Sequence, residues 1–86
     1  MGGQTTDDDA SDGDLLELFL SLPKNQRDSR FGDTARTAKL TGVSVRTIQF
    51  WIETGAIQAL VIGRRYQVDL NSLRMFLKRQ MELKGR

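Results

Sequence analysis

Arg46, Gln49 and Phe50 lie close together near the middle of the chain and carry side chains that can recognise DNA bases. An Arg side chain can donate two hydrogen bonds to guanine, a Gln side chain can pair with adenine, and a Phe ring can contact the thymine methyl group. If this segment is helical, the three residues share a face opposite Ile48 and Trp51. The alternative interpretation is a solvated helix face that carries one exposed Phe.

Two further pairs of residues are candidates for contacts with phosphate groups. Ser44 and Thr47 would lie in the first turn of the same helix, where hydroxyl groups and free backbone N–H groups favour a phosphate, and Ser44 is also expected to cap the helix. Arg64 and Arg65 would form the tip of a hairpin that points toward the minor groove or flanking phosphates. The alternative for the Arg pair is a turn that only promotes solubility.

Arg36 and Lys39, one predicted helix earlier, would lie near the DNA backbone, and either could be merely solvated. Trp51 and Tyr66 are predicted to belong to the core, because they fall on the same side as the aliphatic residues. The predicted DNA-binding residues are therefore Arg36, Lys39, Ser44, Arg46, Thr47, Gln49, Phe50, Arg64 and Arg65.

The composition argues against catalysis. The chain has no Cys and no His, so it can supply neither a thiolate nucleophile, nor a Cys-ligated zinc, nor an imidazole base. Glu53 forms no paired-carboxylate spacing with Asp69 or Glu82, and there is no glycine-rich phosphate loop. We therefore expect no enzymatic activity, no cofactor and no metal site.

The charges of the chain are unevenly distributed. The 86 residues have a formal net charge of +2, but the first 14 contain five Asp residues and no basic residue, whereas the chain from Leu15 onward has a formal charge of +7. This asymmetry indicates a polyanionic partner such as double-stranded DNA, the alternative being a solvated basic surface. The longest apolar run is four residues, so we expect a cytoplasmic, nucleoid-associated protein without a membrane span.

The N-terminal third divides into a tail, a helix and a linker. Residues 1–14 are predicted to be a disordered acidic tail, because they contain too few apolar residues to offset the entropy of ordering. Residues 15–30 are predicted to form a short amphipathic helix, ended by Pro23, and a polar linker up to Arg30. The apolar face of the helix consists of Leu15, Leu18, Phe19 and Leu22.

Residues 31–86 are predicted to form a separate domain that begins with two short helices. Asp33 is expected to cap a helix over residues 34–41, which Gly42 ends in the left-handed conformation. The second helix is expected to run from Val45, after the Ser44 cap, to about Thr54, and Gly55 to end it. Two helices joined across a Gly-Val turn favour a helix-turn-helix, with Ala35, Ala38 and Leu40 of the first helix turned inward.

A hairpin and a last helix are expected to complete this domain. Residues 59–62 and 65–68 are rich in β-prone residues and are separated by Gly63 and Arg64, which suit a tight turn. Asp69 is then expected to cap a helix with an apolar stripe. The fold class is mainly α with a small β-hairpin, a winged helix-turn-helix. The stripe consists of Leu70, Leu73, Phe76, Leu77 and Met81.

The C-terminal part of the last helix, through Met81 and Leu83, is longer than a core of this size needs. It could pair with a second copy of the chain or with the helix over residues 15–22. We expect the intramolecular contact rather than self-association, because small domains need all their apolar surface. A homodimer or a protein partner held through the C-terminal helix, or through Leu15, Leu18, Phe19 and Leu22, is the alternative.

The segment Phe31–Leu77 resembles the excisionase-like and MerR-like winged-helix family of small bacterial and phage DNA-binding proteins. The resemblance is carried, in order, by TGVSVRTI at 41–48, WI at 51–52, GAI at 55–57, IGRRYQV at 62–68, Leu73, and FL at 76–77. The family pattern implies a Thr cap, an acidic residue and a basic wing residue where this chain has Asp33, Arg36 and Val61. The substitution at Arg36 loses the reciprocal capping bond, and Val61 removes a charge from the wing.

Three functions remain open. The first is sequence-specific DNA binding by a small transcriptional regulator, and the second is an excisionase-like architectural factor that bends DNA for site-specific recombination. The third is a protein-interaction adaptor that uses the winged fold. Glu53 and the uncharged wing position favour the adaptor, whereas Arg46, Gln49, Arg64 and Arg65 argue against it.

Overall fold

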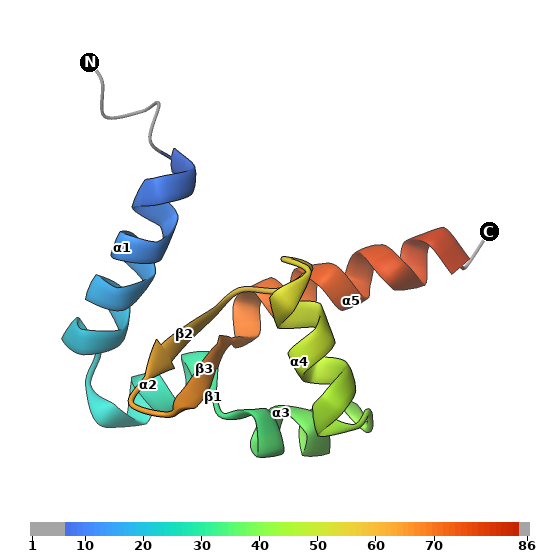
Figure 1. The fold of residues 1–86 in the computed structure, drawn as a ribbon, viewed down its shortest axis with the longest axis horizontal. Helices are drawn as coiled ribbons and strands as arrows, with labels where there is room; N and C mark the ends of the chain where they lie inside the picture. The colour runs from blue at the N-terminus through green and yellow to red at the C-terminus, as the bar shows by residue number, and fades with distance from the viewer. Residues whose placement is uncertain (1–6, 85–86) are drawn as a thin grey trace.

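Five helices and three short strands follow one another along residues 7–84, the part of the chain that the computed structural model describes (Figure 1). The order predicted for the winged helix-turn-helix, two helices, a hairpin and a helix, is confirmed. The elements are α1 (Asp7–Ser21), α2 (Lys24–Arg30), β1 (Phe31–Gly32), α3 (Thr34–Thr41), α4 (Val45–Glu53), β2 (Ala59–Ile62), β3 (Arg65–Asp69) and α5 (Leu70–Lys84).

The residues that flank α3 and α4 determine where these helices begin and end. The carboxylate of Asp33 accepts a hydrogen bond from the backbone N–H of Arg36 at 2.8 Å, and the hydroxyl of Ser44 accepts one from the N–H of Thr47 at 3.0 Å. Each helix therefore has the side-chain cap that the sequence predicts. Gly42 ends α3 with φ of 80°, a conformation in which a side chain would be strained.

The three strands form one antiparallel sheet in the order β1-β3-β2. Val68 of β3 pairs with Ala59 of β2 and with Gly32 of β1. Because side chains alternate along a strand, Ala59 and Val68 face one side of the sheet, and Leu60 faces the other. Each face of the sheet therefore carries an apolar side chain that can pack against the helices.

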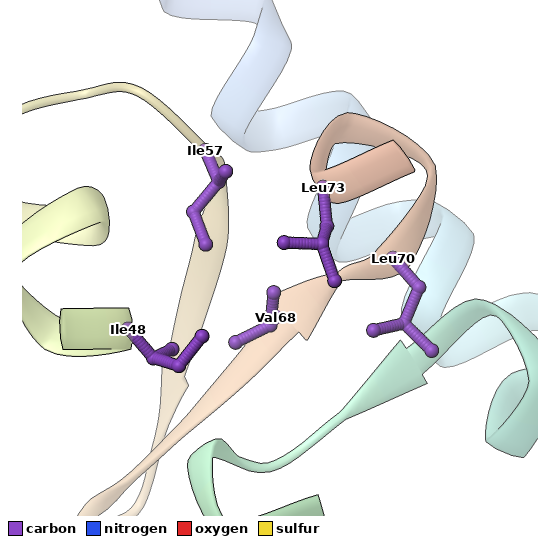
Figure 2. Packing of buried hydrophobic residues seen from close by; sticks show 5 residues of the cluster. All are labelled: Ile48, Ile57, Val68, Leu70 and Leu73. Atoms are coloured by element: carbon purple, nitrogen blue, oxygen red, sulfur yellow. The ribbon is translucent and has the colours of Figure 1, made fainter. Parts of the chain in front are cut away.

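The first face of the sheet packs against α4 and α5. The side chains of this cluster converge between the three elements in Figure 2, and Ile48 and Val68 are fully buried. Burial of such aliphatic side chains makes the main favourable contribution to the free energy of folding of a small domain. The buried members are Ile48, Ile57, Val68, Leu70 and Leu73.

The second face of the sheet packs against α1. Leu15 of α1, Phe31 of β1 and Leu60 of β2 form a separate buried cluster, which Leu18, Phe19 and Leu22 surround. The apolar face of the predicted N-terminal helix is thus buried within the molecule. The expectation that it packs against the C-terminal helix is wrong, because the sheet offers it the apolar face around Leu60.

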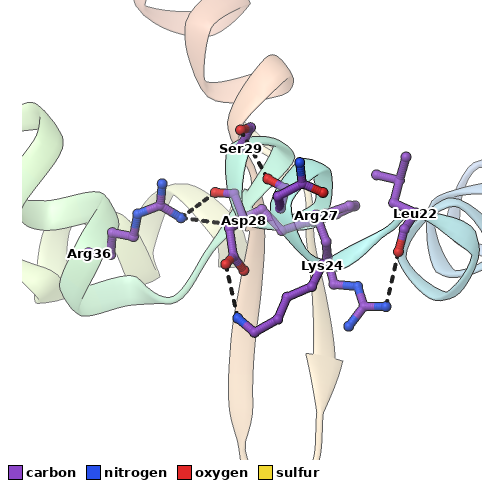
Figure 3. Close-up of polar contacts among 8 residues, drawn as sticks. Leu22, Lys24, Arg27, Asp28, Ser29 and Arg36 are labelled. Atoms are coloured by element: carbon purple, nitrogen blue, oxygen red, sulfur yellow. Dashed lines mark hydrogen bonds and ion pairs between the residues drawn. The ribbon is translucent and has the colours of Figure 1, made fainter.

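The segment predicted to be a linker forms the helix α2. Phe31 and Gly32, which follow it, form β1, the strand that adds to the predicted hairpin. The helix has no buried residue and is held by polar contacts to its neighbours. Arg27 donates a hydrogen bond to the carbonyl of Leu22 at 3.1 Å (Figure 3) and lies 5.0 Å from the centre of the Phe19 ring. Arg30 Nε donates to Asp69 Oδ1 at 2.9 Å, which joins the end of α2 to the start of α5.

The first helix begins at Asp7, earlier than the start near Leu15 that the sequence predicts. It therefore extends into the segment that was expected to be a disordered acidic tail. Acidic residues are favourable in the first turns of a helix because of its dipole, which is consistent with this longer helix. Residues 1–6 of that segment lie outside the described residues, and the disorder of the tail stays a prediction.

The inward face of α3 also differs from the expectation. Ala35 and Leu40 are exposed and Ala38 is half-buried, whereas Thr37 is fully buried. The Thr37 hydroxyl donates to the carbonyl of Asp33 at 2.8 Å, and this bond satisfies the polar group inside the domain.

Candidate nucleic-acid interface

The face of α4 that points away from the core carries the residues expected to read bases. Ile48 is fully buried and fixes the rotation of the helix, so that Arg46, Gln49 and Phe50 are exposed. Phe50 keeps 60% of its surface accessible, an unusual exposure for a large aromatic side chain. A shallow hollow on this face is lined by Arg46, Thr47, Gln49, Phe50 and Glu53.

A second hollow joins α4 to the hairpin. Gln49 contributes to both hollows, so the outer face of α4 and the tip of the β2–β3 hairpin form one continuous surface. The residues of this surface run from Asp33 to Tyr66 in the sequence, and the core beneath them brings them together. The second hollow is lined by Asp33, Thr34, Ala35, Gln49, Arg64, Arg65 and Tyr66.

The hairpin tip has the geometry that projects two arginines. Gly63 has φ of 64° while Arg64 is not among the residues with positive φ, the pattern of a type II′ turn with Gly in first position. Ile62 and Arg65 form the last pair of the two strands, so Arg64 and Arg65 lie at the end of the wing. Both arginines are exposed.

The cations of this surface are available to a ligand. Among the side chains of residues 13–84, which are those that the structure describes, the guanidinium groups of Arg46, Arg64 and Arg65 form neither an ion pair nor a hydrogen bond with another side chain. Exposed arginines that have no partner in the protein can pair with phosphates or base edges without breaking an existing contact. We call the seven residues Ser44, Arg46, Thr47, Gln49, Phe50, Arg64 and Arg65 the candidate interface.

A comparison with protein families matches residues 33–81 to a family described as a helix-turn-helix domain. The chain belongs to this excisionase-like helix-turn-helix family. The matched region runs from the cap of α3 into α5 and contains the whole candidate interface. Membership supports DNA binding by a helix-turn-helix protein. No curated protein and no solved structure gave a significant match.

Arg36 lies outside the two hollows of the helix-turn-helix domain that form the candidate interface. Its guanidinium donates hydrogen bonds to the carbonyls of Asp28 and Phe31, which ties α2 and β1 to α3 (Figure 3). Lys39 is exposed in the last turn of α3 and lines neither hollow. Arg36 and Lys39 therefore line neither hollow, whereas six of the other seven predicted residues line one or both. The seventh, Ser44, is joined to them because it accepts the hydrogen bond from the backbone N–H of Thr47 at 3.0 Å.

Tyr66 is a residue of this surface that the sequence assigned to the core. It is half-buried and lines the second hollow beside Gln49 and Arg64, where its ring and hydroxyl can reach a ligand. Its place one residue after Arg65 was the available signal, because Tyr66 belongs to the second strand pair from the turn and so lies near the wing tip, although it shares the face of the buried Val68. Asp33, Thr34 and Ala35 were also missed, because only the packing of α3 against the wing places them here.

Trp51 lies on the inner side of α4, as predicted. Its ring packs against Phe76 of α5 with a centroid distance of 4.9 Å and an interplanar angle of 61°, and it borders the main core cluster. It remains half-buried, because one side of the ring faces the outer end of α5.

The helices and side chains that the structure describes also bear on membrane insertion and metal binding. Among the side chains of residues 13–84, no group of three or more Asp and Glu residues is close enough to hold a metal ion. None of the helices in residues 7–84 is both long and apolar enough to cross a membrane.

Proposed function

We propose that this protein binds double-stranded DNA sequence-specifically and acts as a small transcriptional regulator. In this proposal α4 enters the major groove, where Arg46 and Gln49 contact base edges and Phe50 contacts a thymine methyl group. The hairpin tip, with Arg64 and Arg65, lies on the flanking phosphates or in the minor groove. The observation that carries the proposal is the continuity of the two hollows through Gln49, which lets one ligand contact helix and wing together.

The chemistry of the surface supports DNA over a protein partner. Its three arginines have no acidic partner within the described residues, and its hydroxyls at Ser44 and Thr47 lie at a helix N-terminus, where backbone N–H groups favour phosphates. The formal charge of +7 from Leu15 onward adds a long-range attraction to a polyanion. A surface that binds another protein does not require three neighbouring arginines without acidic partners, whereas a surface that binds phosphates does.

The test is selection of binding sequences from a random duplex pool, followed by affinity measurements on the selected and on scrambled duplexes at one salt concentration. A specific regulator should prefer the selected duplex by about a thousandfold or more. Equal affinity for both duplexes would contradict sequence-specific recognition and leave only electrostatic binding.

The excisionase-like character of the family favours a second candidate, an architectural factor that bends DNA. The same selected duplex distinguishes the two, because a bend changes the gel mobility of the complex according to where the site lies along the fragment. Mobility that is independent of site position would argue against the architectural factor.

A further inference from the structure

The outer half of α5 carries an apolar groove that the proposed function does not use. Leu73 is the last buried residue of the helix, and the turns that follow extend away from the body of the molecule (Figure 1). Met81 lies in the part of the helix that was predicted to extend beyond the core, and it is 73% exposed. The groove is lined by Trp51, Phe76, Leu77, Gln80, Met81 and Lys84.

A second unpartnered apolar strip lies on α1. Leu15 is buried against the sheet, but Leu16 is 37% exposed and Leu20 is 60% exposed. The two residues are four apart, so they lie on the same outer face of the helix. Glu17, which lies three residues before Leu20 and is therefore its neighbour on the helix surface, is also exposed, as is Asp14 elsewhere on this helix.

The two helices carry opposite charges. The sequence of α1 contains six acidic residues and no basic one. The sequence of α5 contains Arg74, Lys78, Arg79 and Lys84 against the single acid Glu82. An apolar strip on a helix of acidic sequence thus matches an apolar groove on a helix of basic sequence, a pairing that favours a specific encounter.

A chain cannot make this contact with itself. In Figure 1, α1 and the outer half of α5 lie on opposite sides of the molecule, with the sheet between them. The inner face of α1 is also fixed against that sheet by Leu15 and Phe31. The groove can therefore receive α1 only from another copy.

We propose that the groove beside α5 binds the outer face of α1 from a second copy of this chain. Leu16 and Leu20 of one copy then cover Trp51 and Met81 of the other, and Glu17 beside Leu20 comes near the basic side chains of α5. A direct contact between two α5 helices is disfavoured, because it would place like charges against each other. The small apolar strip predicts a weak, concentration-dependent association.

The contact leaves the candidate interface open. Trp51 lies on the inner side of α4, whereas Gln49 and Phe50 lie on its outer side, so a copy docked in the groove does not cover them. The inference is independent of the proposed DNA binding, and its test uses the protein without DNA.

The experiment is sedimentation equilibrium of the full chain from about 10 μM to about 1 mM, where weak pairings of this size are populated. Leu20→Glu and Met81→Glu should each weaken self-association at least about tenfold, because each places a carboxylate in the apolar contact. Leu40→Glu is the matched control, since Leu40 of α3 is 61% exposed and belongs to neither surface. Circular dichroism spectra check that all three variants keep the fold.

Mixing the two defective variants gives the decisive result. Leu20→Glu retains an intact groove and Met81→Glu retains an intact α1, so an equimolar mixture should recover association that neither variant shows alone. Raising the salt from about 0.05 M to about 0.5 M should weaken the wild-type association, because it screens the opposed charges.

Three results would overturn the proposal. They are a wild-type chain that remains monomeric over the whole concentration range, a Leu20→Glu variant that associates as well as wild type, and a mixture that gains nothing over its components. The first result would leave the groove to an acidic helix of another protein, and the second would indicate a symmetric contact between α5 helices.

Discussion

At the scale of single residues, Arg46 and Gln49 are the side chains on which base recognition should depend. They lie three residues apart on the exposed face of α4, on the opposite side from the buried Ile48. We expect Arg46→Ala and Gln49→Ala each to reduce discrimination between the selected and scrambled duplexes by about 1–3 kcal/mol, because each removes a bidentate base contact. Fluorescence anisotropy on both duplexes measures this change.

The control for that experiment is Lys39→Ala, which removes an exposed charge of α3 that lies in neither hollow. It should leave the discrimination unchanged. The melting temperature should stay near the wild-type value in all three variants, since each side chain is exposed. If discrimination survives both substitutions in α4, this helix does not read the bases.

A second residue-scale prediction concerns the ion pair between Arg30 and Asp69. The Asp69 side chain is only 6% exposed and also accepts a hydrogen bond from the N–H of Asn71, so this carboxylate holds α2, β3 and α5 together. Arg30→Met should lower the free energy of unfolding by about 1–3 kcal/mol, because it leaves a buried charge with fewer partners. Urea denaturation measures the loss.

The matched control is Lys24→Met, which removes the other ion pair of the described residues. Lys24 and Asp28 are 83% and 59% exposed. An exposed pair of this type contributes about 0.5 kcal/mol or less, so this variant should be nearly as stable as wild type. Equal destabilisation by the two substitutions would show that the Arg30 contact has no special role.

At the scale of elements, the hairpin should contribute to affinity rather than to sequence preference. Arg64 and Arg65 lie at its tip and can reach two phosphates. Each phosphate contact adds about 0.9 to the slope of log affinity against log salt, so Arg64→Ala with Arg65→Ala should reduce the slope by about 2. Titrations of one duplex at several salt concentrations measure it.

Lys78→Ala with Arg79→Ala removes the same number of charges from α5, away from both hollows of the candidate interface. This control should change the salt slope less than the hairpin variant does. A hairpin variant with an unchanged slope would place the wing away from the DNA.

The elements that the sequence predicted well are those whose ends are fixed by local chemistry. The side-chain caps at Asp33 and Ser44 and the left-handed Gly42 act within a few residues, so the bounds of α3 and α4 could be predicted. The polar helix α2 has no apolar periodicity, and β1 has only two residues. Both depend on partners distant in sequence, of which Asp69 is the clearest, and such partners become visible only in the structure.

In the candidate interface, too, the residues that follow from local sequence were predicted, and those that depend on distant elements were not. Arg46, Gln49 and Phe50 could be assigned to the outer face of α4 because helical periodicity alone separates them from Ile48. The hydrogen bonds of Arg36 to carbonyls of α2 and β1 could not be predicted, because they depend on elements that the sequence did not reveal, and a contact of Arg36 with DNA stays a prediction. The contribution of Tyr66 likewise depends on how the wing packs near α3.

At the scale of the whole molecule, the N-terminal helices extend the helix-turn-helix domain into a larger folded unit. The family match begins at residue 33, yet α1 covers the second face of the sheet and shares a buried cluster with β1 and β2. The ring of Phe19 packs edge-on against Phe31 at a centroid distance of 5.1 Å and also contacts the Arg27 guanidinium. Residues outside the matched domain thus support the strand that carries the wing.

This arrangement predicts that α1 and the helix-turn-helix domain unfold in a single transition. Phe19→Ala should lower the free energy of unfolding by about 2 kcal/mol, less than the loss of about 3–5 kcal/mol for a fully buried Phe, because Phe19 is half-buried. Phe50→Ala is the matched control and should cost less than about 0.5 kcal/mol, since Phe50 is 60% exposed. Urea titrations followed by far-ultraviolet circular dichroism and by Trp51 fluorescence should give coincident curves for the wild-type chain. Loss of helical signal before the Trp51 signal changes would show that α1 unfolds independently of the domain on which it packs.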